Sequence, residues 1–254
     1  ILHLKKRMKI TKYDNAIFGL RPIIEAIQAG KEMDTLFIQK GLKNELFQEL
    51  WELVRKHRVN YKHVPIEKLN RLTRKNHQGV FAFISPITFH KTDNIIQEVF
   101  EKGETPLFLI LDRITDVRNF GAIVRSAECS GVHTVIIPEK GAAAVNSDAL
   151  KTSAGALHNI PICREFNLKA TIEYLKNSGL QIIGCTEKTE DSIYQPDFTI
   201  PTAIIMGSEE DGISGEYLKL CDHKAKIPMR GTIGSLNVSV SAGVILYEAV
   251  RQRQ

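Results

Sequence analysis

The stretch LFLILDRITDVRNFGAIVRSAECSG, residues 107–131, decides the fold class. Its first five residues form a continuous apolar run, which is typical of a parallel strand covered on both faces. The part that follows predicts a helix over 119–131, because Phe120, Ile123, Val124 and Ala127 recur at the spacing of one helical face. A buried strand followed by a helix is the repeating unit of an α/β domain with a parallel sheet.

Apolar runs of the same kind recur further along the chain, with helical patterns between them. They predict strands over 134–137, 181–185 and 203–206, and helices over 168–177 and 215–220. We therefore expect a doubly wound α/β domain over 106–254. Its last helix, over 240–250, is apolar almost all round apart from Glu248, which predicts that it is buried, with a second subunit as one candidate cover.

The front part of the chain shows a shorter α/β alternation. Pro22 opens a predicted helix that Gly30 closes, and the region as a whole predicts a small domain over 15–88. Residues 1–14 are polar and basic and are expected to form a loose tail. Residues 89–105 lack a strong strand and are expected to be a linker with one short helix. The predicted helices cover 22–29, 45–57 and 65–72, and the predicted strands cover 35–39, 59–64 and 80–84.

The composition excludes several classes of protein. Hydrophobic residues make up 43% and charged residues 25% of the chain, which is ordinary for globular domains and unlike collagen, coiled coils or disordered chains. No run is long and apolar enough for a bilayer, and lysines interrupt the first residues, so neither a membrane span nor a secretory signal is expected. The four cysteines form no CxxC pair and no His/Cys cluster exists, so we expect a cytoplasmic protein without a metal.

The charge of the chain is distributed unevenly. Residues 1–90 hold 17 Lys and Arg against 8 Asp and Glu, a net charge of +9, whereas residues 91–254 have a net charge of −4. A basic front domain favours a polyanionic partner, although a solvated basic surface without a partner fits the same numbers. The aromatic residues of this region show no stacking-motif spacing, so recognition of RNA shape and phosphate is favoured over base stacking.

Three polar patches follow predicted strands, where open α/β sheets bind their ligands. The first contains Asn119 and Arg125. A purely structural interpretation fits them as well, with Asn119 capping a helix and Arg125 exposed on its surface. The second, IIMGSEEDGIS (204–214), has three acids that would repel phosphate, and the chain has no Walker lysine and no GxGxxG. It suits a cationic ligand without phosphate, such as S-adenosylmethionine, or is a polar turn. The third, IPMRGTIGSLNVSVSAGV (227–244), places Ser and Asn in an apolar stretch, where they line a ligand site or pack at a helix start.

In this order and at these separations, the patches resemble the three motifs of the SPOUT superfamily of RNA 2′-O-ribose methyltransferases. The motifs of the TrmH family are similar to NFGAIVRSA (119–127), MGSEEDGI (206–213) and residues 227–244 of this chain. The similarity is closest to the branch of the family that acts on a guanosine of 23S ribosomal RNA. The front segment NAIFGLRPIIEAI (15–27) looks like the L30e-like RNA-binding domain of that family. Ser208 and Glu210 depart from the more glycine-rich second motif of that branch.

The resemblance implies a fold and a set of site residues. It implies an α/β-knot (SPOUT) domain with a C-terminal trefoil knot behind the L30e-like domain, a homodimer, and 23S ribosomal RNA as the partner. It implies S-adenosylmethionine as the cofactor, bound by Gly207, Ile227, Leu236, Met229, Met206 and Thr186. It implies a polar catalytic set of Arg125, Asn119, Glu209, Asn237 and Ser235.

The reaction implied is attack of a ribose 2′-hydroxyl on the sulfonium methyl group. We favour a charged Arg125 that stabilises the developing alkoxide over a neutral arginine acting as a base, because a guanidinium stays protonated. Transfer RNA as the substrate, a non-catalytic RNA-binding protein and a nicotinamide-dependent oxidoreductase are the alternatives; the missing GxGxxG disfavours the last. The residues expected to contact RNA phosphates are Arg71, Arg74, Lys75 and Arg118.

Overall fold

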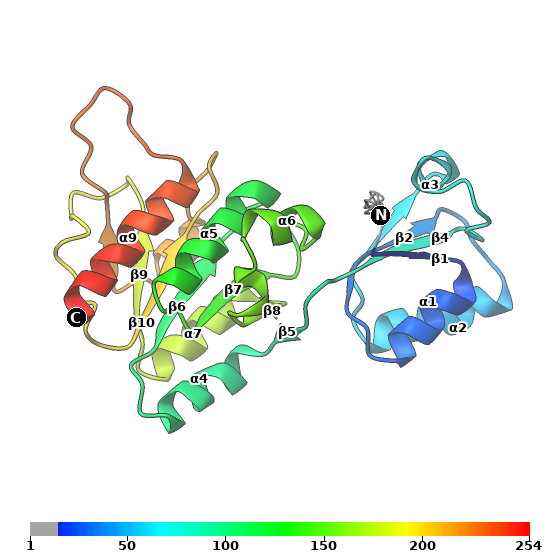
Figure 1. The fold of residues 1–254 in the computed structure, drawn as a ribbon, viewed down its shortest axis with the longest axis horizontal. Coiled ribbons are helices and arrows are strands. Elements are labelled where there is room, and N and C mark those ends of the chain that lie inside the picture. Colours follow the sequence, from blue (N-terminus) through cyan, green and yellow to red (C-terminus); the bar gives the residue numbers. More distant parts are fainter. Residues whose placement is uncertain (1–14) are drawn as a thin grey trace, which may run out of the picture. The chain divides into compact units, whose positions relative to one another are not determined.

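A computed structural model of the chain describes residues 15–254 and divides the chain into two compact units (Figure 1). The first unit ends at Pro86, and the second spans Ile87–Gln254. The basic tail predicted over 1–14 lies outside the described residues. Among residues 15–254, no helix combines the length and apolar character needed to span a membrane.

The first unit is a four-stranded mixed sheet with helices on both faces. The strand order is β1–β4–β2–β3, in which only β2 and β3 run parallel. Helices α1 and α2 pack on the face that carries Leu36 and Ile38, and the short α3 packs on the other face. The elements are β1 (Ala16–Phe18), α1 (Leu20–Gln28), β2 (Met33–Gln39), α2 (Glu45–Lys56), β3 (Tyr61–Val64), α3 (Ile66–Leu72) and β4 (Val80–Ile84).

The second unit is built on a seven-stranded sheet in which all pairs of neighbouring strands are parallel. The order is β11–β9–β10–β6–β7–β8–β5, with β6 in the middle, and this confirms the predicted doubly wound α/β fold. The strands are β5 (Phe89–His90), β6 (Leu107–Leu111), β7 (Thr134–Pro138), β8 (Ile162–Glu165), β9 (Gln181–Cys185), β10 (Thr202–Met206) and β11 (His223–Ala225).

Helices cover both faces of this sheet (Figure 1). Alternate residues of β6 divide between the two cores: Leu109 faces one set of helices and Phe108 the other. One face is covered by α5 (Val117–Cys129), α6 (Ser147–Thr152), the 3₁₀ turn η1 (Ala156–His158) and α9 (Val238–Arg253), and the other by α4 (Thr92–Glu101), α7 (Leu168–Asn177) and α8 (Gly215–Leu218).

The segment predicted as a linker, 89–105, contains the expected short helix, α4, but it is not a linker. Phe89 and His90 form β5, which extends the sheet beside β8, and Ile95, Ile96 and Val99 of α4 are buried in the core on one face of the sheet. A two-residue strand has no pattern of its own and exists only through its partner, so the sequence around it reads as irregular. These residues therefore belong to the second unit.

The last helix differs from its prediction as well. It is longer than 240–250, and only one side of it packs on the sheet and on α5, through residues such as Ala242, Ile245 and Leu246. Val240 and Tyr247 lie on the other side and are about half exposed, at 50% and 54%. The helix thus has apolar residues on both sides, and the rest of the chain covers only one of them.

Candidate active site

The parallel register brings several chain segments together at one edge of the second sheet. Met206 at the end of β10 lies beside Leu111 of β6 and Cys185 of β9, and Ala225 of β11 is also level with Cys185. The segments that follow these strands therefore leave the sheet at the same edge, which is where open α/β sheets hold their ligands. They comprise 112–116, 186–201, 207–214 and 226–237.

The segment after β10 is a tight hairpin that only glycine permits at its base. The amide of Ser208 donates to the carbonyl of Gly212 (3.2 Å), and the amide of Gly212 donates back (3.0 Å). A Cβ on Gly207 would lie 2.1 Å from the carbonyl carbon of Gly212 and from the amide nitrogen of Ile213. The hairpin presents Glu209, Glu210 and Asp211 at its tip.

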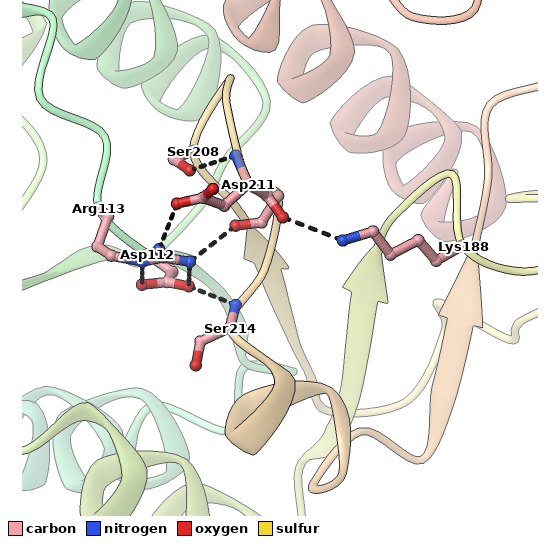
Figure 2. A network of polar contacts seen from close by, with 7 residues as sticks. Asp112, Arg113, Lys188, Ser208, Asp211 and Ser214 are labelled. Carbon is pink, nitrogen blue, oxygen red and sulfur yellow. Dashed lines mark hydrogen bonds and ion pairs between the residues drawn. The ribbon is translucent and has the colours of Figure 1, made fainter.

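An ion pair with a buried carboxylate anchors this hairpin to the end of β6 (Figure 2). Asp112, only 2% exposed, accepts two hydrogen bonds from the guanidinium of Arg113 (3.0 and 3.1 Å) and one from the amide of Ser214 (2.7 Å). The hydrogen bonds that Arg113 donates to Asp112 raise the pKa of Arg113, so the guanidinium stays charged. Arg113 also has a left-handed backbone (φ 57°), which is uncommon for a side chain of this size.

Arg113 and Lys188 both reach the tip of the hairpin. Arg113 donates to the carboxylate of Asp211 (2.9 Å) and to the carbonyl of Gly212 (3.1 Å), and Lys188 donates to the carbonyl of Asp211 (3.1 Å). Figure 2 shows the two cations approaching Asp211 from opposite sides. The segments after β6, β9 and β10 are thereby fixed to one another.

A chain of polar side chains continues from the hairpin across α5 to α9. Asn119, in the first turn of α5, donates to the carboxylate of Glu209 and accepts from the amide group of Asn237 (3.2 Å). Asn237 caps α9 by accepting from the amide and the hydroxyl of Ser239 (2.9 and 2.6 Å). Three of the predicted catalytic residues, one from each motif, are therefore in direct contact.

Arg125 and Ser235, the other two predicted catalytic residues, are not part of this contact. Arg125 is exposed on α5, about 120° around the helix from Asn119, and within residues 15–254 it has no polar partner. Arg118, one of the predicted RNA contacts, lies two turns before Arg125 on the same exposed side. Ser235 is exposed in the segment 226–237, where Leu236 is 40% exposed.

The residues predicted to hold a cofactor lie along the same edge of the sheet. Met206 and Thr186 are buried at the ends of β10 and β9, and the amide of Thr186 donates to the carbonyl of Ala225 (3.0 Å). Ile227 and Met229 are half-buried in the segment after β11. Beside them, burial raises the pKa of the Cys185 thiol to about 12, so this thiol stays neutral.

The cleft in front of the hairpin is acidic. It has a volume of about 270 Å³, and the segments 113–116 and 208–211 line it. Its walls carry four carboxylates against the single guanidinium of Arg113, a balance that disfavours phosphate and favours a cation or a hydrogen-bond donor. Within the described residues, no group of three or more His, Cys, Asp or Glu side chains has an arrangement that fits a metal ion.

The remaining predicted RNA contacts belong to the first unit. Arg71 is exposed in α3, and Arg74 and Lys75 are exposed in the turn that follows it. The ammonium of Lys75 lies over the ring of Phe18, 5.8 Å from its centre. These three cations share one side of the unit.

The sequence reasoning missed the network of Asp112, Arg113, Lys188 and Asp211. The pair Asp112–Arg113 directly follows the apolar run of β6, a position that marks the ligand edge of the sheet. Its partners lie about a hundred residues further on, so only the sheet register brings them together.

Two family models match the chain and together cover most of it. Residues 106–247 match the SpoU rRNA methylase family, and residues 16–90 match a domain described as RNA 2′-O ribose methyltransferase substrate binding. The two matches fall on the second and the first unit respectively.

Relatives and solved structures agree with these matches. The chain is 32% identical to a putative TrmH family tRNA/rRNA methyltransferase of Bacillus subtilis, over 93% of this chain and 95% of the relative. It is 35% identical to a protein of the same description from Staphylococcus saprophyticus, over 93% and 95%. The crystal structure of the SpoU methyltransferase AviRb from Streptomyces viridochromogenes, in complex with AdoMet, is similar with a TM-score of 0.59 and 30% identity, over 94% of this chain and 90% of that one. A TrmH/SpoU tRNA modifying enzyme of A. aeolicus has a TM-score of 0.55 and 34% identity, over 63% and 83%.

Proposed function

The chain belongs to the SpoU (TrmH) family of RNA 2′-O-ribose methyltransferases, and from this premise we propose that it methylates a guanosine ribose of 23S ribosomal RNA with S-adenosylmethionine as the methyl donor. The observation that carries the site assignment is the contact of Asn119, Glu209 and Asn237, which joins the three sequence motifs at the ligand edge of the sheet.

The residues at this edge fit S-adenosylmethionine. Thr186, Gly207 and Ile227 follow three neighbouring strands, so they lie together at the edge where an adenine and a ribose would bind. The acidic cleft beside them suits a ligand with a sulfonium and an ammonium group and no phosphate. When bound, the cofactor supplies an activated methyl group. Met206, Met229 and Leu236 complete the proposed pocket.

Within this site, the polar side chains would orient the ribose and stabilise the charge that develops on its 2′-oxygen. Asn119 is held by Glu209 and Asn237, so its amide group is fixed in position. Arg125 lies outside this contact, about 120° around α5 from Asn119. It is exposed and has no polar partner among the described residues, and we assign it to a substrate phosphate and the developing alkoxide. Ser235 and Leu236 belong to the segment 226–237, which leaves the sheet at the same edge.

We further propose that two copies of the chain form a homodimer through the uncovered side of α9. Val240 and Tyr247 lie two turns apart on that side and are about half exposed, and Val244 between them is only half-buried against the core. Ile233, in the segment before α9, is also exposed, at 77%. We also propose that the C-terminal segment is knotted, as in the SPOUT fold.

For the RNA itself, phosphate contacts are assigned to Arg71, Arg74 and Lys75 of the first unit and to Arg118 of the second. Transfer RNA is a second candidate substrate, because the A. aeolicus enzyme similar to this chain is a tRNA modifying enzyme. The match of residues 16–90 to a substrate-binding domain supports a larger RNA, since the A. aeolicus enzyme aligns with only 63% of this chain.

The test is the transfer of a radiolabelled methyl group from S-adenosylmethionine to unmodified ribosomal RNA and transfer RNA. We expect label in 23S RNA alone; label in transfer RNA alone would contradict the substrate assignment.

Arg125→Lys should reduce kcat at least tenfold because it loses the guanidinium fork, while calorimetry should show nearly unchanged affinity for S-adenosylmethionine. The control is Arg21→Lys, an exposed arginine of α1 paired with Glu49, which should keep normal turnover.

A further inference from the structure

The first unit carries a cluster of aromatic rings at the β3 edge of its sheet. Trp51 is at the centre, with its ring centre 5.0 Å from that of Tyr61 and 6.1 Å from those of Phe47 and His63. Tyr61 and His63 lie 5.5 Å apart in an edge-to-face arrangement. The four rings come from two elements, α2 and β3, and form one continuous aromatic surface.

The fold places these rings beside the core and not inside it. Tyr61 and His63 alternate with Lys62 on an edge strand, so both point to the side of the sheet that α2 covers. On α2 the fully buried positions are Leu50 and Val54, while Phe47 and Trp51 are half-buried. Tyr61 is 41% exposed and His63 is exposed, so this aromatic surface is open to solvent.

The chain around these rings is basic. Residues 53–66 contain Arg55, Lys56, Arg58 and Lys62 and no Asp or Glu; the nearest acids are Glu52 and Glu67. All four of these cations are exposed; Lys62 points to the opposite face of the sheet from the rings, and Arg55, Lys56 and Arg58 lie at the end of α2 and just after it. Exposed rings beside several cations complement a nucleic acid, because bases stack on the rings while the cations neutralise the backbone phosphates.

We propose that this aromatic cluster stacks an unpaired base of the RNA substrate. The inference rests on the proposed function, and it adds a single-stranded element to what the first unit recognises. It assigns base stacking to Trp51, Tyr61 and His63, whereas the phosphate contacts proposed for α3 and its following turn are on the other face of the sheet. The proposal thus differs from recognition by shape and phosphate alone, which the scattered aromatic residues of the sequence favour.

The chain contains its own reporter for this proposal, because Trp51 is its single tryptophan. Titrating the full-length protein with a short oligouridylate should quench the tryptophan fluorescence, since a stacked base contacts the ring cluster directly. A duplex RNA of the same length presents no unpaired base and should leave the fluorescence nearly unchanged, even where anisotropy shows that it binds.

Substitution of Tyr61 sharpens the test. Tyr61→Ala should weaken oligouridylate binding by about 5- to 30-fold, as expected for the loss of one stacking ring, without weakening duplex binding. Tyr61→Phe retains the ring and should bind nearly as the wild type does. Tyr174→Ala, which removes a tyrosine of similar exposure (43%) from α7 of the second unit, is the matched control and should have no effect.

Two outcomes overturn the proposal. One is oligouridylate binding that leaves the tryptophan fluorescence unchanged. The other is an equal loss of affinity for single-stranded and duplex RNA in Tyr61→Ala. If the aromatic surface instead binds a protein partner, neither RNA should quench the tryptophan fluorescence, which is the first of these two outcomes. Methyl transfer to ribosomal RNA, measured in parallel on the wild type, separates the two claims: if transfer persists without quenching, the stacking proposal alone fails, and if transfer is absent, the proposed function fails.

Discussion

Gly207 shows how a single residue determines the geometry of the site. Any side chain at this position would overlap the backbone of Gly212 and Ile213, 2.1 Å away, and the backbone at the base of a two-way hydrogen-bonded hairpin has little room to move. The role of this residue is therefore steric: it lets the hairpin close directly behind the end of β10.

We expect Gly207→Ala to destabilise the protein by more than about 2 kcal/mol, in the range of overpacking substitutions, and to abolish binding of S-adenosylmethionine. Gly215→Ala is the matched control, because a Cβ there meets nothing within 4 Å. Thermal unfolding and calorimetric titration of both variants give the measurement. Normal cofactor binding by Gly207→Ala would show that the hairpin is not part of the pocket.

At the scale of elements, the hairpin after β10 is held by residues outside it. Asp112 is buried, and its oxygens accept from Arg113 and from the backbone at Ser214. The contact of Asn119 with Glu209 depends on this anchor, because Glu209 is at the tip of the hairpin.

Asp112→Asn should therefore cost about 2 kcal/mol of unfolding free energy, since it weakens the hydrogen bonds that a buried carboxylate accepts from Arg113 and from the amide of Ser214. Methyl transfer should fall with it. Lys188→Met removes only the exposed bond to the carbonyl of Asp211 and should cost less than about 1 kcal/mol. Denaturant unfolding of both variants measures the difference; equal costs would contradict the assignment of Asp112 as the anchor.

Helix α9 carries a pH-dependent contribution to stability. The hydrogen bonds from Arg251 to Glu248 hold the pKa of that buried carboxyl below its ordinary value of 4.5. Since the folded pKa is lowered, the contribution is complete above pH 4.5 and is lost as the pH falls through the folded pKa.

We expect Glu248→Gln to lower the unfolding free energy by about 1 kcal/mol at neutral pH and to make its decline below pH 4.5 less steep. Glu173→Gln, at an exposed position of α7, should leave the profile unchanged. Parallel profiles for Glu248→Gln and the wild type would show that another carboxyl dominates the acid response.

The elements that the sequence predicted well are those with a complete pattern of their own. The bounds of β4, β9 and α7 agree with the predicted ranges, since each is a strongly apolar or amphipathic run between turn residues. β1, β5, β8, α6 and β11 were missed because they have only two to six residues, and their formation depends on partners distant in sequence. The motifs indicated Asn119, Glu209 and Asn237, but the anchor at Asp112 depends on the sheet register, which local patterns do not contain.

At the scale of the whole molecule, the chain consists of two units with separate cores. The first unit has the excess of basic residues and the aromatic cluster, and the second holds the residues at the ligand edge of the sheet. This separation predicts that the two binding functions can be divided between fragments.

A fragment of residues 87–254 should fold, bind S-adenosylmethionine with near-normal affinity and lose at least tenfold in RNA affinity, because it keeps the complete seven-stranded sheet and lacks the basic unit. Calorimetry measures the affinity of the fragment for the cofactor, and filter binding measures its affinity for ribosomal RNA. Undiminished RNA affinity of the fragment would contradict the role given to the first unit.

The most direct test of the account is the position of the transferred methyl group. Ribosomal RNA labelled by the enzyme is hydrolysed in alkali, which needs a free 2′-hydroxyl at each cleaved linkage. We predict that the label is recovered in alkali-resistant dinucleotides, because a methylated 2′-oxygen blocks cleavage. On enzymatic digestion these dinucleotides should yield 2′-O-methylguanosine. Label recovered in mononucleotides, as a methyl group on a base, would contradict it.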